Sequence, residues 1–111
     1  MRSRSQMLAV LVLCLATEAQ GGVAYTSYGV GSVACSRWTD LKERGDLDVW
    51  SLRQWVLGYI TAAGAHAEQR LPKSDPEALF LTAEGFCKAH PLDDVSDAAE
   101  YTLQQLKTKA Q

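Results

Sequence analysis

The chain contains few of the residues from which most catalytic and metal-binding sites are built. Its only two histidines, His66 and His90, have no cluster of further metal ligands near them in the sequence. No glycine-rich phosphate-binding loop follows a predicted strand, and no serine lies in a nucleophile-elbow pattern. We therefore predict that the protein is not an enzyme and that it holds no metal and no cofactor.

Strand patterns, repeats and a strong charge of one sign are also missing. No run of residues alternates between apolar and polar in the manner of a β-strand. The formal net charge of −2 is too small and too mixed to indicate a nucleic-acid partner. The apolar stretch 55–67 has 13 uncharged residues, whereas a membrane span needs roughly 20 apolar ones. These absences predict a small all-α domain.

Residues 1–24 have the pattern of a secretory signal peptide. Arg2 and Arg4 precede the ten-residue apolar segment 7–16, and small residues up to Ala24 provide a cleavage site. A retained membrane anchor is disfavoured because the apolar segment is too short. Cleavage would release residues 25–111 outside the cytoplasm as one domain without stable membrane insertion. This part has 9 basic and 12 acidic residues, a net charge of −3.

Cysteine is scarce, and its three positions are informative. Cys14 leaves with the signal peptide, so Cys35 and Cys87 remain as an even pair in an exported chain. A disulfide between them is the expected state outside the cytoplasm, and it would stabilise a core that is small for independent folding. The alternative is a thiol nucleophile, in which Cys87 would act together with His90 one helical turn away.

Hydrophobic residues recur at helical spacing in four segments of the chain, and helix start and stop signals border these segments. The predicted capping side chains are Ser32, Asp48, Asp75 and either Asp93 or Asp94. The fold class is therefore a small four-helix domain with one disulfide. The predicted helices span residues 33–44, 47–67, 76–90 and 95–109.

Segment 47–67 is apolar over most of its circumference, so we expect it to be the central helix, covered from several sides. Gly58 in its middle costs about 1 kcal/mol relative to alanine. We expect a neighbouring backbone to pack closely there, with a hinge or a ligand notch as the alternative. Gly45 should end the preceding helix, and residues 25–31 should form a loose lead-in.

Four acidic residues begin the last predicted helix: Asp93, Asp94, Asp97 and Glu100. They suit the positive end of the helix dipole, and lysines at the other end suit its negative end. A cation site is the alternative, although the spacing is not that of a calcium-binding loop. An enzyme with a carboxylate or tyrosine site also stays open as a minor alternative.

The aromatic residues provide the candidate binding surface. Tryptophans in so small a chain are expected mainly in the core, but tryptophan is seldom fully buried and is enriched at interfaces. If aromatic side chains bind a partner protein, we expect them to be Trp38, Trp50, Trp55 and Tyr59.

Several short motifs resemble those of small exported proteins. They are Cys35 with Trp38, the segment Trp55-Val56-Leu57-Gly58-Tyr59-Ile60, Cys87, the step His90-Pro91, and Asp97-Ala98-Ala99. This layout resembles the periplasmic proteins of the HdeA/HdeB type, and it is also similar to the Rap1a/Tai immunity proteins. The resemblance implies a four-helix fold, one disulfide, a periplasmic location and no enzymatic activity.

The resemblance implies that the partners are other proteins, and it leads to two functional hypotheses. The first is an acid-stress chaperone that binds unfolded clients. Full protonation would leave 9 basic residues and two charged histidines, a net charge of +11, whose self-repulsion would loosen the fold. The second is an immunity protein that inhibits a secreted effector, a cell-wall hydrolase. A homodimer is compatible with either hypothesis.

Overall fold

The computed structural model describes residues 25–109, and this part of the chain is all-α. The predicted signal peptide, with Cys14, lies outside the described residues. An isolated bridge pairs Ala34 with Asp94, and no strand occurs within 25–109. The prediction of a four-helix domain is confirmed, with a short 3-10 helix added at its start. The elements are η1 (Gly29–Ser32), α2 (Cys35–Glu43), α3 (Val49–Ala65), α4 (Pro76–Ala89) and α5 (Val95–Thr108).

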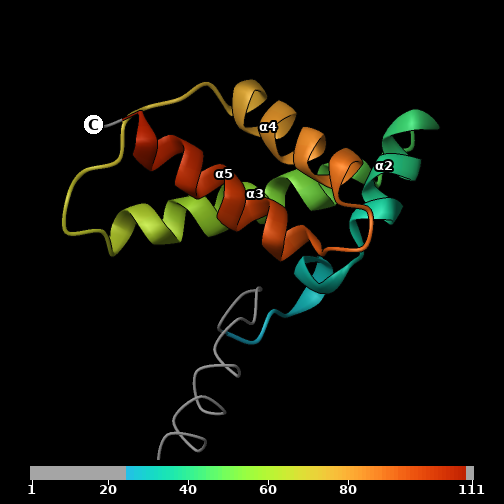
Figure 1. Ribbon diagram of the computed structural model, residues 1–111, viewed down its shortest axis with the longest axis horizontal. Helices are drawn as coiled ribbons and strands as arrows, with labels where there is room; N and C mark the ends of the chain where they lie inside the picture. Colours follow the sequence, from blue (N-terminus) through green and yellow to red (C-terminus); the bar gives the residue numbers. More distant parts are fainter. Residues whose placement is uncertain (1–24, 110–111) are drawn as a thin grey trace, which may run out of the picture.

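Helix α5 lies between α3 and α4, and it also contacts η1 and α2 (Figure 1). The long connection 66–75 joins α3 to α4 at one end of the domain, and α2 lies at the opposite end. No helix within 25–109 is long and apolar enough to cross a membrane.

Two helices begin as their sequences predict. The Asp75 carboxylate accepts a hydrogen bond from the Glu77 N–H at 3.2 Å, and Pro76 occupies the first turn of α4. At the start of α5, the backbone N–H of Asp94 donates to Asp97 Oδ2 at 3.0 Å, and the Asp94 side chain in turn accepts from the N–H of Asp97. This reciprocal pair is a capping box, so Asp94 rather than Asp93 is the cap.

The other two predicted caps differ from the structure, and the cap at Ser32 is wrong. The Ser32 hydroxyl donates to Gly29 O within η1, because extended backbone at Val33 and Ala34 separates η1 from α2. That extended backbone pairs with the start of α5: Val95 N–H donates to Val33 O at 2.9 Å. Asp48 lies at the predicted N-cap position of α3, but its side chain makes no capping hydrogen bond, and its own N–H donates to Asp46 Oδ1 at 2.9 Å.

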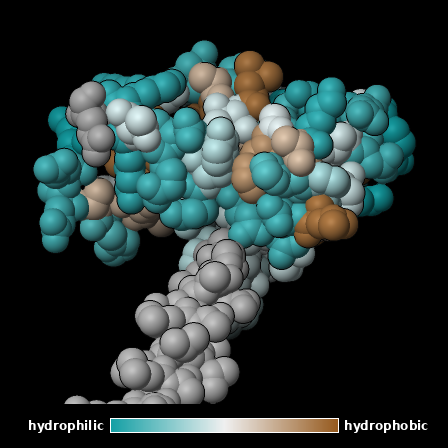
Figure 2. All heavy atoms as spheres, viewed as in Figure 1, coloured by the Kyte–Doolittle hydropathy of each residue, from teal (hydrophilic) through white to brown (hydrophobic). Residues whose placement is uncertain are grey.

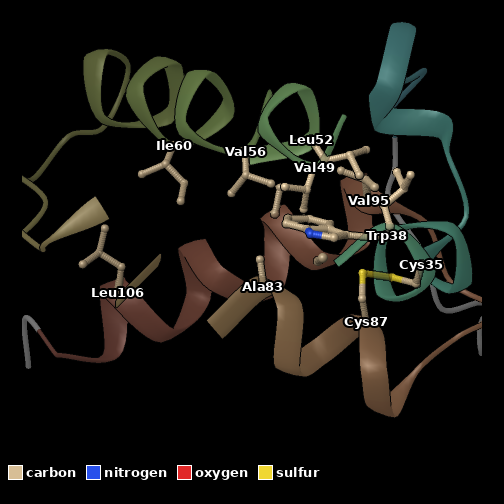
Figure 3. Packing of buried hydrophobic residues seen from close by; sticks show 13 residues of the cluster. Cys35, Trp38, Val49, Leu52, Val56, Ile60, Ala83, Cys87, Val95 and Leu106 are labelled. Carbon is tan, nitrogen blue, oxygen red and sulfur yellow. A yellow bond between two sulfur atoms is a disulfide. The ribbon is translucent and has the colours of Figure 1, made fainter. Parts of the chain in front are cut away.

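The core surrounds Trp38, whose side chain is fully buried (Figure 3). A disulfide joins Cys35 of α2 to Cys87 of α4 beside it, with the Cα atoms 4.6 Å apart and a sequence separation of 52. The predicted disulfide is therefore confirmed. Apolar residues from α3 and α5 complete this cluster, including Val56 and Val95.

Helix α3 is contacted by α2, α4, α5 and η1, in agreement with the predicted cover from several sides, but it is less buried than α5. Its buried residues form a single stripe, whereas α5 buries half of its length. The reason lies in side-chain size, because α5 carries small residues where two helices approach it. The buried residues of α3 are Val49, Leu52, Val56 and Ile60, and those of α5 are Val95, Ser96, Ala98, Ala99, Thr102, Leu103 and Leu106.

Gly58 has no packing role within residues 25–109, and the prediction of close packing there is wrong. It is exposed, and a Cβ added to it would meet no atom within 4 Å. Gly45 does end α2 as predicted, with a φ of +66° that most side chains disfavour. The close approach occurs instead at Gly31, whose added Cβ would overlap the ring of Trp55.

Candidate functional site

Three helices meet at a buried carboxylate, Glu84 of α4, which is 6% exposed. Arg53 of α3 donates from both Nε and Nη2 to Glu84 Oε1, each at 2.8 Å. Lys42 of α2 forms an ion pair with the other carboxylate oxygen. We call these three residues the Glu84 junction. A buried carboxylate is tolerated only with such partners, so the junction ties α2 and α3 to α4.

Two aromatic rings hold Arg53, one of the two cations of this junction. The Arg53 guanidinium lies 5.1 Å from the centre of the Trp50 ring and 5.0 Å from that of Phe80. Trp50 and Phe80 meet edge to face, with centroids 6.2 Å apart. The ring faces attract the cation and leave its N–H groups directed to the carboxylate. Arg53 therefore has one defined position, between Glu84 and the two rings.

A second cluster lies further along α3, and we call it the aromatic ladder: Tyr25, Tyr59 and Trp55. Their rings are stacked in that order, with centroids 5.9 and 5.6 Å apart. Trp55 Nε1 donates to the backbone oxygen of Tyr28 at 3.2 Å, and the close approach of Gly31 adds a further contact. The ladder therefore binds residues 25–32 to α3, and the prediction of a loose lead-in is wrong.

The ladder ends on a second carboxylate. The Tyr59 hydroxyl donates to Glu100 of α5. Burial raises the pKa of Tyr59 well above its usual value, and the hydrogen bond to Glu100 raises it further. Burial is also the main cause that raises the pKa of Tyr25. Tyr59 therefore stays a neutral donor over the whole physiological range of pH.

The structure does not assemble the predicted protein-binding residues into one surface. Trp38 is fully buried in the folded protein, so it is not part of a protein surface in that state. Trp55 and Tyr59 are partly buried beneath residues 25–32. Trp50 is 49% exposed, and a partner could reach it directly. The four side chains were grouped by residue type, but one is buried, two are partly buried and one is half exposed.

Helix α4 has an exposed apolar ridge that was not predicted from the sequence. Leu81 is 57% exposed, and Gly85 lies one turn later on the same side of the helix. A groove of about 330 Å³ runs between this ridge and α2, and another of about 460 Å³ runs between it and α5. Leu81 lies outside the buried stripe of its helix, and this position could have indicated the exposed ridge from the sequence. Figure 2 shows that hydrophobic residues form separate patches on one face of the molecule.

The structure also bears on the two alternatives that involve a thiol nucleophile or a bound cation. Cys87 is bonded to Cys35, so it is no thiol nucleophile in this state, and His90 instead stacks on Phe86 with centroids 4.4 Å apart. In the acidic cluster at the start of α5, the Asp97 side chain is used for capping. Within residues 25–109, no group of three or more histidine, cysteine or acidic side chains could hold a metal ion.

Comparison with protein-family models, with curated protein sequences and with solved structures finds no match for this chain. The resemblance to the HdeA/HdeB and Rap1a/Tai proteins therefore stays a prediction from sequence motifs. Any statement about function has to rest on the contacts described above.

Proposed function

We propose that the protein is an exported, non-catalytic chaperone that binds unfolded proteins in acid. One observation carries this proposal: two carboxylates hold α3 to its neighbours. Glu84 binds Arg53 and Lys42, and Glu100 accepts from Tyr59. Acid acts directly on both contacts, because carboxylates as a class are protonated below about pH 3.

Protonation has a different consequence at each contact. At the Glu84 junction it removes the negative charge between Lys42 and Arg53, which leaves the mostly buried Arg53 without its carboxylate partner and next to a second cation. At Glu100 it removes a charged acceptor, which weakens the hydrogen bond from Tyr59. The whole exported chain would at the same time carry +11 charges. Helix α3 is therefore the element that acid should loosen first.

The disulfide limits how far the fold opens. It joins α2 to α4 independently of pH, so these helices stay together after α3 loosens. Departure of α3 would uncover the apolar cluster around Trp38, against which Leu52 and Val56 pack. A constrained molecule with a newly exposed apolar face is suited to holding aggregating chains.

The test is light scattering of a client that aggregates in acid, measured at about pH 2.5 with the exported protein present or absent. We expect suppression near equimolar protein, and none near neutral pH. The variant Glu84→Gln lacks one acid-sensitive contact and should begin to suppress aggregation at a higher pH. No suppression by the parent protein at any acidic pH would refute the chaperone role.

A second candidate is an inhibitor of a secreted cell-wall hydrolase. The observation that favours it is the exposed ridge of α4, which is accessible in the folded protein without any acid trigger. The test is to mix the exported protein with a hydrolase encoded beside its gene and to measure wall degradation. Full hydrolase activity at saturating protein would exclude that enzyme as the target.

A further inference from the structure

The ridge on α4 contains Gly85, a glycine that the packing of the fold does not require. A glycine inside a helix costs roughly 1 kcal/mol relative to alanine. No atom lies within 4 Å of the position that a Cβ would take at Gly85, so packing within residues 25–109 does not require it. Leu81, one turn earlier, exposes 57% of its surface. An exposed leucine beside a bare stretch of helix backbone suits contact with another molecule.

The grooves on either side make the ridge a shaped surface. The groove toward α2 has Trp38 in its lining, and Lys42 and Lys88 also line it. The groove toward α5 has Tyr101, which is 41% exposed, and Phe86, whose ring centroid lies 5.1 Å from that of Tyr101. Two apolar grooves beside a low ridge can accept side chains from two rows of an approaching helix.

The charge of this face differs in sign from that of the whole exported chain. Lys42 and Glu84 in the lining are paired with each other, which leaves two lysines, Lys88 and Lys109, against one acid, Glu43. Glu84 is already bound by Arg53 and Lys42. The exported chain as a whole has a net charge of −3. The groove lining therefore has a small net positive charge on an acidic protein, and it complements an acidic partner.

We infer that the α4 ridge docks an amphipathic helix of a partner protein, with acidic residues on both borders of its apolar stripe. The apolar side chains enter the two grooves, and the close approach of the two backbones takes place at Gly85. The acidic borders meet Lys88 on one side and Lys109 on the other. This interaction goes beyond the proposed acid-triggered activity, because it uses the folded protein near neutral pH.

The first experiment uses two synthetic peptides of roughly 18 residues with leucines at helical spacing. One has glutamates on both borders of the leucine stripe, and the other has lysines at the same positions. The exported protein, labelled with ¹⁵N, is titrated with each near pH 7. We expect the amide signals of Leu81, Gly85 and Lys88 to shift with the acidic peptide, and the basic peptide to bind at least about tenfold more weakly.

Two glycine variants provide the matched control. Gly85→Gln and Gly58→Gln both replace an exposed glycine in the middle of a helix, and neither new side chain meets an atom at its Cβ. Both should fold and gain helix stability. Only Gly85→Gln should abolish binding of the acidic peptide, while Lys88→Glu should weaken it.

Several outcomes would overturn the inference. They are equal binding of the two peptides, signal shifts on another face, and equal loss of binding in both glycine variants. Self-association of the parent protein in sedimentation, lost in Gly85→Gln, would assign the ridge to a second copy of this chain instead. Failure of this experiment leaves the acid-triggered activity intact, since that activity is measured with a different client near pH 2.5.

Discussion

Helix α3 is held by two carboxylates, and the two contacts work in different ways. On the α4 side, Glu84 is buried and accepts from two cations, Arg53 and Lys42. On the α5 side, Glu100 is partly exposed and accepts from the neutral hydroxyl of Tyr59. The Glu84 contact depends on the presence of charge, and the Glu100 contact depends on one hydrogen bond to the aromatic ladder.

Because the two contacts differ in kind, we expect acid and alkali to weaken the two sides of α3 to different extents. Loss of a buried charge leaves its counter-ions unpaired, which costs more than loss of one hydrogen bond. The helices that supply Glu84 and Lys42 are also joined by the disulfide, whereas Tyr25 stacks on Tyr59, which in turn stacks on Trp55. Loss of the carboxylate charge in acid should therefore cost more on the α4 side, and strong alkali should act on Tyr59.

The largest effect is expected from the loss of the disulfide in the double variant Cys35→Ser, Cys87→Ser. The bond closes a loop across 52 residues of sequence, so its removal should lower the free energy of unfolding by about 4 kcal/mol. Urea denaturation measures this change in the free energy of unfolding. Dithiothreitol should shift the parent protein by a similar amount and leave the variant unchanged. An unaltered urea midpoint would show that the α4 side does not depend on this bond.

The second largest effect is expected for Glu84→Gln, which leaves Lys42 and Arg53 without their carboxylate. We expect a loss of about 3 kcal/mol in the free energy of unfolding, because breaking a buried ion pair exposes its full desolvation cost. The matched control is Asp40→Asn on the surface of α2, where the carboxylate pairs with Arg44 at 2.9 Å while both side chains are more than half exposed. That change should cost under about 1 kcal/mol. Equal losses for the two variants would contradict the role of burial at Glu84.

On the other side of α3, Gly31→Ala should detach residues 25–32. The added methyl group overlaps the Trp55 ring, and overpacking of this kind costs about 2 kcal/mol. Limited proteolysis should then remove residues before Ser32 much faster. Gly58→Ala, which meets open space, should instead stabilise the protein by roughly 1 kcal/mol. Unchanged proteolysis in Gly31→Ala would mean that the ladder does not hold this segment.

The smallest effect near neutral pH is expected for Tyr59→Phe, at about 1 kcal/mol for one hydrogen bond. Its pH dependence is more informative. Because the folded pKa of Tyr59 lies above its ordinary value, the stability it contributes is complete below about pH 10 and declines as the pH rises above that. Urea midpoints at increasing pH should fall less steeply in Tyr59→Phe than in the parent. Parallel curves would show that Tyr59 titrates normally in the folded protein.

Local features were predictable from the sequence because they need only neighbouring residues. Asp75-Pro76 starts α4, and Gly45 ends α2, since a cap or a left-handed turn depends on a few consecutive positions. The failure at Ser32 has a tertiary cause. The backbone after it pairs with the start of α5, some 60 residues later, and so cannot begin a helix.

The candidate sites were harder to predict, because the same residue type occurs in opposite environments. Trp38 is the centre of the core, whereas Trp50 is half exposed over a guanidinium. Gly31 lies against a ring, whereas Gly58 and Gly85 face open space. Glu84 resembles any other glutamate in a helical sequence until Lys42 and Arg53 are brought to it from two other helices.

The sequence by itself determined the four helices, most of their ends and the cysteine pairing, because these follow from local spacing and from the two cysteines that lie beyond the predicted signal peptide. Only the tertiary structure decided which carboxylate is buried, which tryptophan is covered and which face of α4 remains open. Each of these depends on what a distant helix places opposite the residue, and a single helix does not carry that information.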